Sequence, residues 1–108
     1  MAGEITIADV VIAKLAGRAA LTTYGVVGMR SSTPVRRVAD LFRGPLTEGV
    51  EVETEDGGVR VGLHVVMERG VNLSQVTATL QEQVRYEIER YTGLKVGDIT
   101  VHVEDLRE

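Results

Sequence analysis

Hydrophobic residues recur every three or four positions in three stretches of this 108-residue chain, a spacing that predicts amphipathic helices. The stretches are residues 7–21, residues 34–43 and residues 73–92. The apolar side of the first is rich in alanine and holds one glycine. Small side chains of this kind predict that the first helix approaches a neighbouring element closely.

Capping residues mark the predicted helix ends. Thr6 is placed to cap the first helix, and Asn72 with Gln75 forms a capping-box pattern before the last one. Gly93 follows that last helix at a C-cap position. The apolar stripe predicted for this helix consists of Leu73, Val76, Leu80, Val84, Ile88 and Tyr91.

Alternation of apolar and polar residues predicts strands elsewhere in the chain. The alternation is clearest over residues 50–55 and 58–68, which a Gly-rich turn at 56–58 joins as a hairpin. Shorter patterns predict strands over residues 25–31 and 98–104. The chain is therefore predicted to contain four strands.

The order of these elements predicts a single α+β domain over residues 1–108. An N-terminal helix precedes a β-α-β-β-α-β order, the pattern of split β-α-β folds. We expect a two-layer sandwich, with the helices packed on one face of a four-stranded sheet. If the strands over 58–68 and 98–104 are neighbours, the helix between them allows them to run parallel.

Composition narrows the classes of function. The chain is 44% hydrophobic and 26% charged, as in ordinary globular proteins. Cysteine is absent, which excludes disulfides, thiolate metal sites and a cysteine nucleophile. Aromatic residues make up 4% of the chain, which leaves few platforms for stacking bases. No apolar run is long enough to span a bilayer, and the N-terminus lacks a signal-peptide pattern. We therefore expect a cytoplasmic protein without direct membrane insertion.

Charge is unevenly distributed along the chain. The net charge of −4 divides into +3 over residues 1–44 and −7 over residues 45–108. Complementary charges on one small domain suit head-to-tail self-association, which produces rings or filaments. The basic segment contains four candidate interaction residues: Arg30, Arg36, Arg37 and Arg43. They are suited to phosphates, anionic lipid or an acidic partner surface, or they form the hydrated side of a short helix.

A candidate metal or acid–base site is formed by two histidines on the outward phase of their strands. His64 and His102 would approach each other if those strands are neighbours. Carboxylates available nearby are Glu51, Glu53, Glu55 and Glu104. A zinc site needs three or four ligands converging at about 2 Å, and a solvated sheet face with mixed charges accounts for the same pattern.

Other motifs are few. Gly25 and Gly28 match the GxxG pattern of KH-type RNA-binding domains, although two valines stand between the glycines. The chain contains no nucleophile-elbow, Walker or Rossmann motif. No catalytic residue, cofactor-binding residue or cofactor is therefore predicted.

Three stretches of the chain share a recognisable arrangement. A helix ends before a Gly-Val strand, a valine-rich strand follows, and a second helix leads through Thr-Gly-Leu into another valine-rich strand. The stretches are Val11–Ala20 with Tyr24–Met29, Gly58–Val66, and Gln81–Leu94 with Val96–Glu104. In this order and spacing, over roughly residues 5–104, the chain resembles the alkaline-shock/general-stress protein family of Gram-positive bacteria.

The resemblance implies a non-catalytic cytosolic protein that assembles, gathers at the membrane through a membrane-anchored protein partner and supports the envelope under stress. It brings no catalytic residues to this chain, and the arginine segment within residues 31–49 lies outside the shared pattern. The leading hypothesis is an interaction module that forms homo-oligomers and binds no nucleic acid. The alternatives are a KH-like RNA-binding module and a metal-dependent enzyme using His64 and His102.

Overall fold

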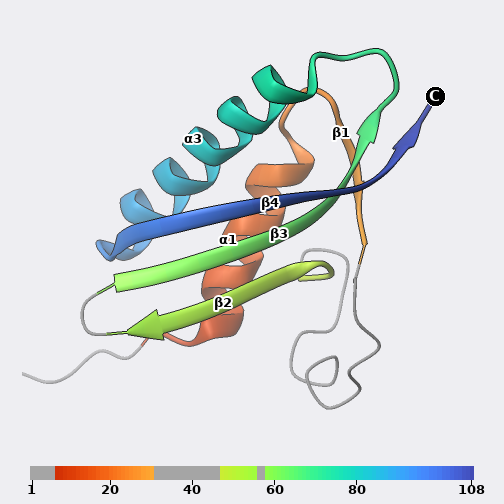
Figure 1. Cartoon of the computed structure of the whole chain (residues 1–108). Helices are drawn as coiled ribbons and strands as arrows, with labels where there is room; N and C mark the ends of the chain where they lie inside the picture. Colours follow the sequence, from red (N-terminus) through yellow and green to blue (C-terminus); the bar gives the residue numbers. More distant parts are fainter. Residues whose placement is uncertain (1–6, 31–46, 56–57) are drawn as a thin grey trace, which may run out of the picture.

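The computed structural model describes residues 7–30, 47–55 and 58–108 (Figure 1). In chain order they form α1 (Asp9–Leu21), β1 (Val26–Met29), β2 (Val50–Glu55), β3 (Gly58–Glu68), α3 (Leu73–Thr92) and β4 (Lys95–Arg107). The predicted α+β class is confirmed. The helix predicted over residues 34–43, the cap at Thr6 and the middle of the hairpin turn lie outside the described residues.

β3 is the centre of a four-stranded sheet. β4 runs parallel to it along one edge, from the Gly58–Lys95 pair to the Glu68–Arg107 pair. The opposite edge is shared by two short strands placed end to end, because β2 and then β1 pair with successive parts of β3, both antiparallel. The sheet is therefore mixed, and the parallel pairing expected across the last helix is present.

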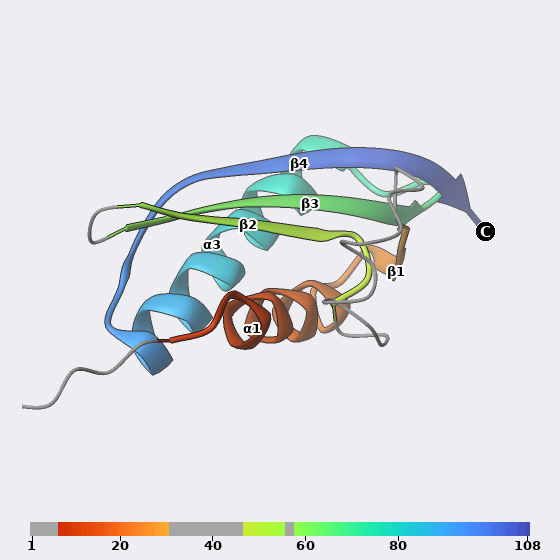
Figure 2. The ribbon, with the colours of Figure 1, turned by 90° about the horizontal axis from the view of Figure 1, so that it is seen from below.

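The two described helices lie on the same side of the sheet (Figure 2). α1 contacts α3 and β2, whereas α3 also contacts β4. The core between the layers is almost wholly aliphatic, and α1 contributes mainly small side chains to it. Its buried residues are Ile12, Ala13, Ala16, Gly17, Ala19 and Ala20, so the predicted close approach of this helix is present.

α3 begins and ends at the predicted residues. The Asn72 side chain accepts a hydrogen bond from the Gln75 backbone N–H at 3.1 Å, and Gly93 ends the helix with a φ of 76°. The predicted apolar stripe is too long at both ends, because Leu73 is 37% and Tyr91 57% exposed. The four positions between them face the core, and Tyr91 lies beside Arg18 of α1 instead.

α1 and β1 are shorter than predicted. α1 starts at Asp9 with Ala8 at its N-cap, and no side chain caps it. β1 covers four of the seven residues predicted as a strand. Between the two elements, Gly25 has a φ of 97°, and a Cβ there would lie 2.7 Å from a methyl carbon of Val76. This close approach joins the end of α1 to the start of α3.

β4 is 13 residues long, and the prediction covered its central seven. Pairing with β3 extends the strand at both ends, where the apolar residues Val96 and Leu106 are out of phase with the alternation of Ile99, Val101 and Val103. The register shifts twice, and the second shift places Glu104 between the paired residues Val103 and Asp105. Within the described residues, no helix is long and apolar enough to cross a membrane.

Candidate interaction surface on the open face of the sheet

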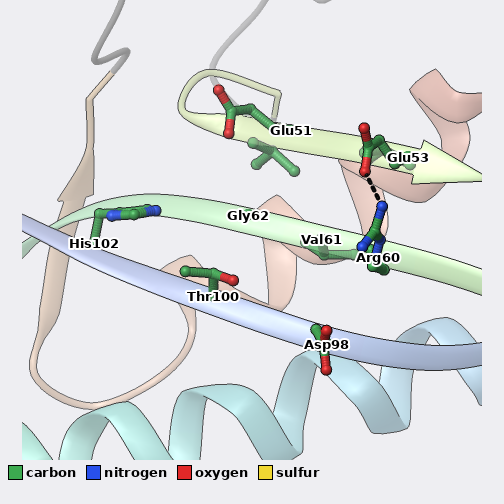
Figure 3. Close-up of a pocket in the computed structure, with 10 residues that line it drawn as sticks. Glu51, Glu53, Arg60, Val61, Gly62, Asp98, Thr100 and His102 are labelled. Carbon is green, nitrogen blue, oxygen red and sulfur yellow. Dashed lines mark hydrogen bonds and ion pairs between the residues drawn. The ribbon is translucent and has the colours of Figure 1, made fainter.

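The face of the sheet that points away from α1 and α3 carries a shallow hollow of about 640 Å³ (Figure 3). Gly62 of β3 lies at its middle, paired with Glu51 of β2 on one side and Thr100 of β4 on the other. Charged side chains surround these small residues. The lining consists of Val50, Glu51, Val52, Glu53, Arg60, Val61, Gly62, Asp98, Thr100 and His102.

His64 stands beside this hollow at a structural junction. Its backbone N–H donates to the Gly49 carbonyl at 2.8 Å, and its carbonyl accepts from the Arg30 N–H at 3.0 Å. These two hydrogen bonds lie at the position on β3 where its paired strand changes from β2 to β1. Gly49 has a φ of 76°, and a Cβ there would lie 2.8 Å from the His64 carbonyl oxygen. Only glycine fits this position without displacing the backbone.

The His64 side chain lies between two carboxylates. Its Nδ1 is 2.7 Å from Glu104 Oε2, and its Nε2 is 3.3 Å from Glu51 Oε1. Ionised carboxylates accept hydrogen bonds but cannot donate them, so both contacts are hydrogen bonds when the ring carries both protons. The ring therefore links β2, β3 and β4 across the open face.

The two histidines meet, as expected for neighbouring strands. His64 pairs with His102 in the β3–β4 register, and their rings stack with centroids 4.6 Å apart and 9° between planes. His64 is 7% exposed, so the prediction that this side of β3 is solvated is wrong at this position. Side chains from both neighbouring strands cover the ring, because β3 is the central strand.

The contacts of this cluster are not those of a metal site. Parallel stacked rings do not aim their nitrogens at a common point, and a metal needs converging ligands. Across the described residues, no group of three or more His, Asp or Glu side chains is placed to hold a metal ion. Glu53, a predicted member of the cluster, contacts Arg60 at 2.8 Å instead. Glu55 pairs with Gly58 at the far end of β2.

The predicted arginine cluster is only partly described. Arg30 follows β1, and its guanidinium lies 3.0 Å from the Asp105 carboxylate of β4. The Leu106 backbone N–H, and then Arg30, lower the pKa of Asp105 from its ordinary value. The other members, Arg36, Arg37 and Arg43, lie outside the described residues.

The KH-type interpretation of Gly25 and Gly28 is wrong. A GxxG loop connects two helices, whereas the residues here enter β1, which pairs with β3. Gly28 is opposite Val66 in that pairing. The two valines between the glycines belong to the strand, which accounts for their departure from the polar loop pattern.

Sequence reasoning missed a cluster on the helix side of the molecule. The Arg90 guanidinium lies 5.6 Å from the Tyr86 ring centre and 5.3 Å from that of Tyr91, and it donates to the Tyr86 hydroxyl at 2.9 Å. Arg18 of α1 lies 5.9 Å from the Tyr91 ring centre. The four-residue spacing of Tyr86 and Arg90 was the available signal. Arg18 joins them only through the packing of α1 against α3.

Comparison with known proteins agrees with the resemblance found in the sequence. The alkaline shock protein 23 family, described as having a cell envelope-related function, matches residues 1–108. Uncharacterized protein YloU of Bacillus subtilis (strain 168) is 30% identical over 107 residues, covering 97% of this chain and 89% of YloU. Uncharacterized protein Spy1614 of Streptococcus pyogenes serotype M6 is 34% identical over 110 residues, covering 97% and 88%.

A second Bacillus subtilis (strain 168) relative, uncharacterized protein YqhY, is 31% identical over 101 residues, covering 94% of this chain and 75% of YqhY. No solved structure gives a match to the chain. The family match extends over every described element of the fold, and relatives of 30% identity or more cover nearly the whole chain. The chain therefore belongs to the alkaline shock protein 23 family, whose function is related to the cell envelope.

Proposed function

We propose that this chain is a non-catalytic interaction module of the cell-envelope stress response, which self-associates and docks on a membrane-anchored protein partner from the cytoplasmic side. The family description relates the chain to the envelope and names no catalysed reaction. The more specific role is supported by the shape and the chemistry of the described surface.

The observation that carries the proposal is the open face of the sheet. One face is covered by α1 and α3, while the other presents a shallow polar hollow (Figures 2 and 3). Polar side chains in and beside it contact neighbours within the chain, as in the Glu53–Arg60 pair of its lining and the His64–Glu104 pair next to it. A surface of ordered polar groups loses little side-chain entropy when it binds another protein.

The arginines of the basic segment are assigned to partner docking in this proposal. Arg30, Arg36, Arg37 and Arg43 fall within a stretch of net charge +3 in an otherwise acidic chain. Because Arg30 is already placed beside Asp105, the remaining three supply the charge that an acidic partner surface would recognise.

Self-association is tested by sedimentation velocity of the purified chain over a wide range of concentration at low and high salt. The average mass is expected to rise with concentration and to fall with salt, since charge contributes to the contact. A chain that remains monomeric at high concentration and low salt would refute the self-association.

Docking is tested by binding the labelled chain to salt-washed membrane vesicles from a bacterium that encodes a family member. Binding is expected to disappear after protease treatment of the vesicles and to be absent from protein-free vesicles of the same lipids. The charge reversal R36E/R37E is expected to weaken binding, and R69E/R107E, with the same change in charge, serves as its control. Equal binding to protein-free vesicles would contradict a protein partner.

A further inference from the structure

All three tyrosines of the chain lie at the surface. Tyr24 is 80%, Tyr86 55% and Tyr91 57% exposed, so none contributes to the aliphatic core. The Arg90 guanidinium lies beside the rings of both Tyr86 and Tyr91, and Arg18 lies beside Tyr91. We call Arg18, Tyr86, Arg90 and Tyr91 the helix-side cluster. Tyrosine and arginine are the residues enriched at the centres of protein interfaces, because both combine a large contact area with polar groups.

The helix-side cluster carries one positive charge that no acidic side chain of the described residues contacts. Arg18 lies 3.1 Å from Glu87, so its charge is paired. Arg90 contacts the hydroxyl of Tyr86 and two rings, and it has no carboxylate partner among the described residues. Its guanidinium thus has N–H groups available for a further acceptor.

The hollow on the open face is acidic, which complements the positive charge of the helix-side cluster. Glu51, Glu53 and Asp98 surround it, against one arginine, Arg60, which is bound to Glu53 (Figure 3). Within the described part of the chain, Asp98 has no cationic partner. The Glu51 side chain reaches over Gly62, where its Oε1 would lie 3.0 Å from an added Cβ, so the room for a projecting side chain is on the Thr100 and Asp98 side of the hollow.

The two surfaces lie on opposite sides of the two-layer fold, so they cannot meet within one molecule (Figure 2). We infer that the helix-side cluster of one copy docks in the sheet-face hollow of a second copy, with Arg90 directed at Asp98. This inference rests on the proposed self-association and names its contact. The contact joins two different surfaces, so every assembly still has one unoccupied cluster at one end and one unoccupied hollow at the other. The assembly therefore grows head to tail.

The inference is tested by sedimentation velocity at a concentration where the wild-type chain associates. R90E and D98R are each expected to weaken association by about tenfold or more. The double variant R90E/D98R restores the charge pair with its sign exchanged, so it is expected to regain association. R69E, an exposed reversal at the end of β3 and remote from both surfaces, is the control and is expected to associate like the wild-type chain.

A mixing experiment tests the head-to-tail geometry. Y86A/Y91A removes both aromatic rings of the helix-side cluster, and D98K blocks the sheet-face hollow. Each variant alone is expected to be monomeric, whereas an equimolar mixture is expected to form dimers and nothing larger, because each partner supplies one intact surface. Circular dichroism and thermal unfolding check that each variant is folded, and the exposure of all three positions favours this.

Two results would overturn the inference. Single variants that associate like the wild-type chain would place the contact elsewhere, although self-association itself would stand. A mixture that stays monomeric would contradict the pairing of these two surfaces. A wild-type chain that never associates is a different result, since it would refute the self-association in the proposed function.

Discussion

Neighbouring residues of β3 are buried by different means on the two faces of the sheet. On the helix side, Leu63 is fully buried among aliphatic side chains. On the open side, its neighbour His64 is 7% exposed, although no described helix covers that face. Apolar area removed from water stabilises the first residue, whereas the second is held between the side chains of Glu51 and Glu104. The comparison shows that a polar sheet face can be ordered without a second layer.

The largest expected effect is on the helix side. Leu80→Ala removes a fully buried side chain of α3 and leaves a cavity, so the free energy of unfolding is expected to fall by about 2–5 kcal/mol. Leu73→Ala is the control, because the same change at the start of α3 affects a side chain that is 37% exposed. Urea unfolding measures both. Equal losses would show that the burial of the α3 stripe does not control stability.

A smaller effect is expected at the junction of β2 and β1. Gly49 and Gly93 share a φ of 76°, but a Cβ at Gly49 meets backbone oxygens, whereas nothing lies within 4 Å of one at Gly93. Gly93→Ala is expected to lower the free energy of unfolding by about 1–2 kcal/mol, from the left-handed backbone alone. Gly49→Ala is expected to lower the free energy of unfolding clearly more than Gly93→Ala does. If urea unfolding gives the same loss of free energy of unfolding for both variants, the backbone at the junction can move to accommodate a side chain.

The histidine pair tests the open face directly. His64→Ala leaves Glu51 and Glu104 without their shared partner, and a loss of about 1–3 kcal/mol in the free energy of unfolding is expected. His102→Ala removes only an exposed stacking ring and is expected to cost less than about 1 kcal/mol. Thermal unfolding of the two variants shows which one loses more stability. A reversed order would mean that the carboxylate contacts contribute little.

The smallest effect concerns the exposed end of β4. The Leu106 N–H and, after it, Arg30 lower the pKa of Asp105 from its ordinary value of 3.8. A lowered carboxyl pKa stabilises the fold above that ordinary value, and this contribution is lost as the pH falls through the folded pKa. Arg30→Ala is expected to return the pKa only partway, because the Leu106 N–H remains. Carboxyl-carbon NMR titration measures it. A wild-type pKa at or above 3.8 would contradict the Arg30–Asp105 contact.

The elements with sustained periodicity could be predicted to the residue. β3 and α3 have the predicted limits because apolar residues recur along their whole length and capping residues mark the ends of α3. The ends of β4 could not be found in this way, because two register shifts in its pairing with β3 put Val96 and Leu106 out of phase with the central alternation. The start of α1 was missed for a related reason: Ala8 precedes the helix without a capping side chain.

The contact between the two histidines could be predicted from the sequence only on the condition that their strands are neighbours. His64 and His102 stand on the outward phase of two strands, and they meet because those strands are parallel neighbours in register. The stacking of the two rings depends on the register of β3 and β4, and the placement of Glu104 depends on a register shift. No pattern in the sequence indicates either one. The helix-side cluster likewise needed the packing of α1 on α3 to bring Arg18 to Tyr91.

The α+β class, the limits of β3 and α3, and the likeness to the family could all be read from the order of residues along the chain. These features follow from local periodicity and capping, which act over a few residues. Tertiary structure alone decided that His64 is buried between carboxylates and that tyrosines and arginines gather opposite an acidic hollow. Such contacts join residues far apart in the chain, and their geometry depends on strand order, register and helix packing.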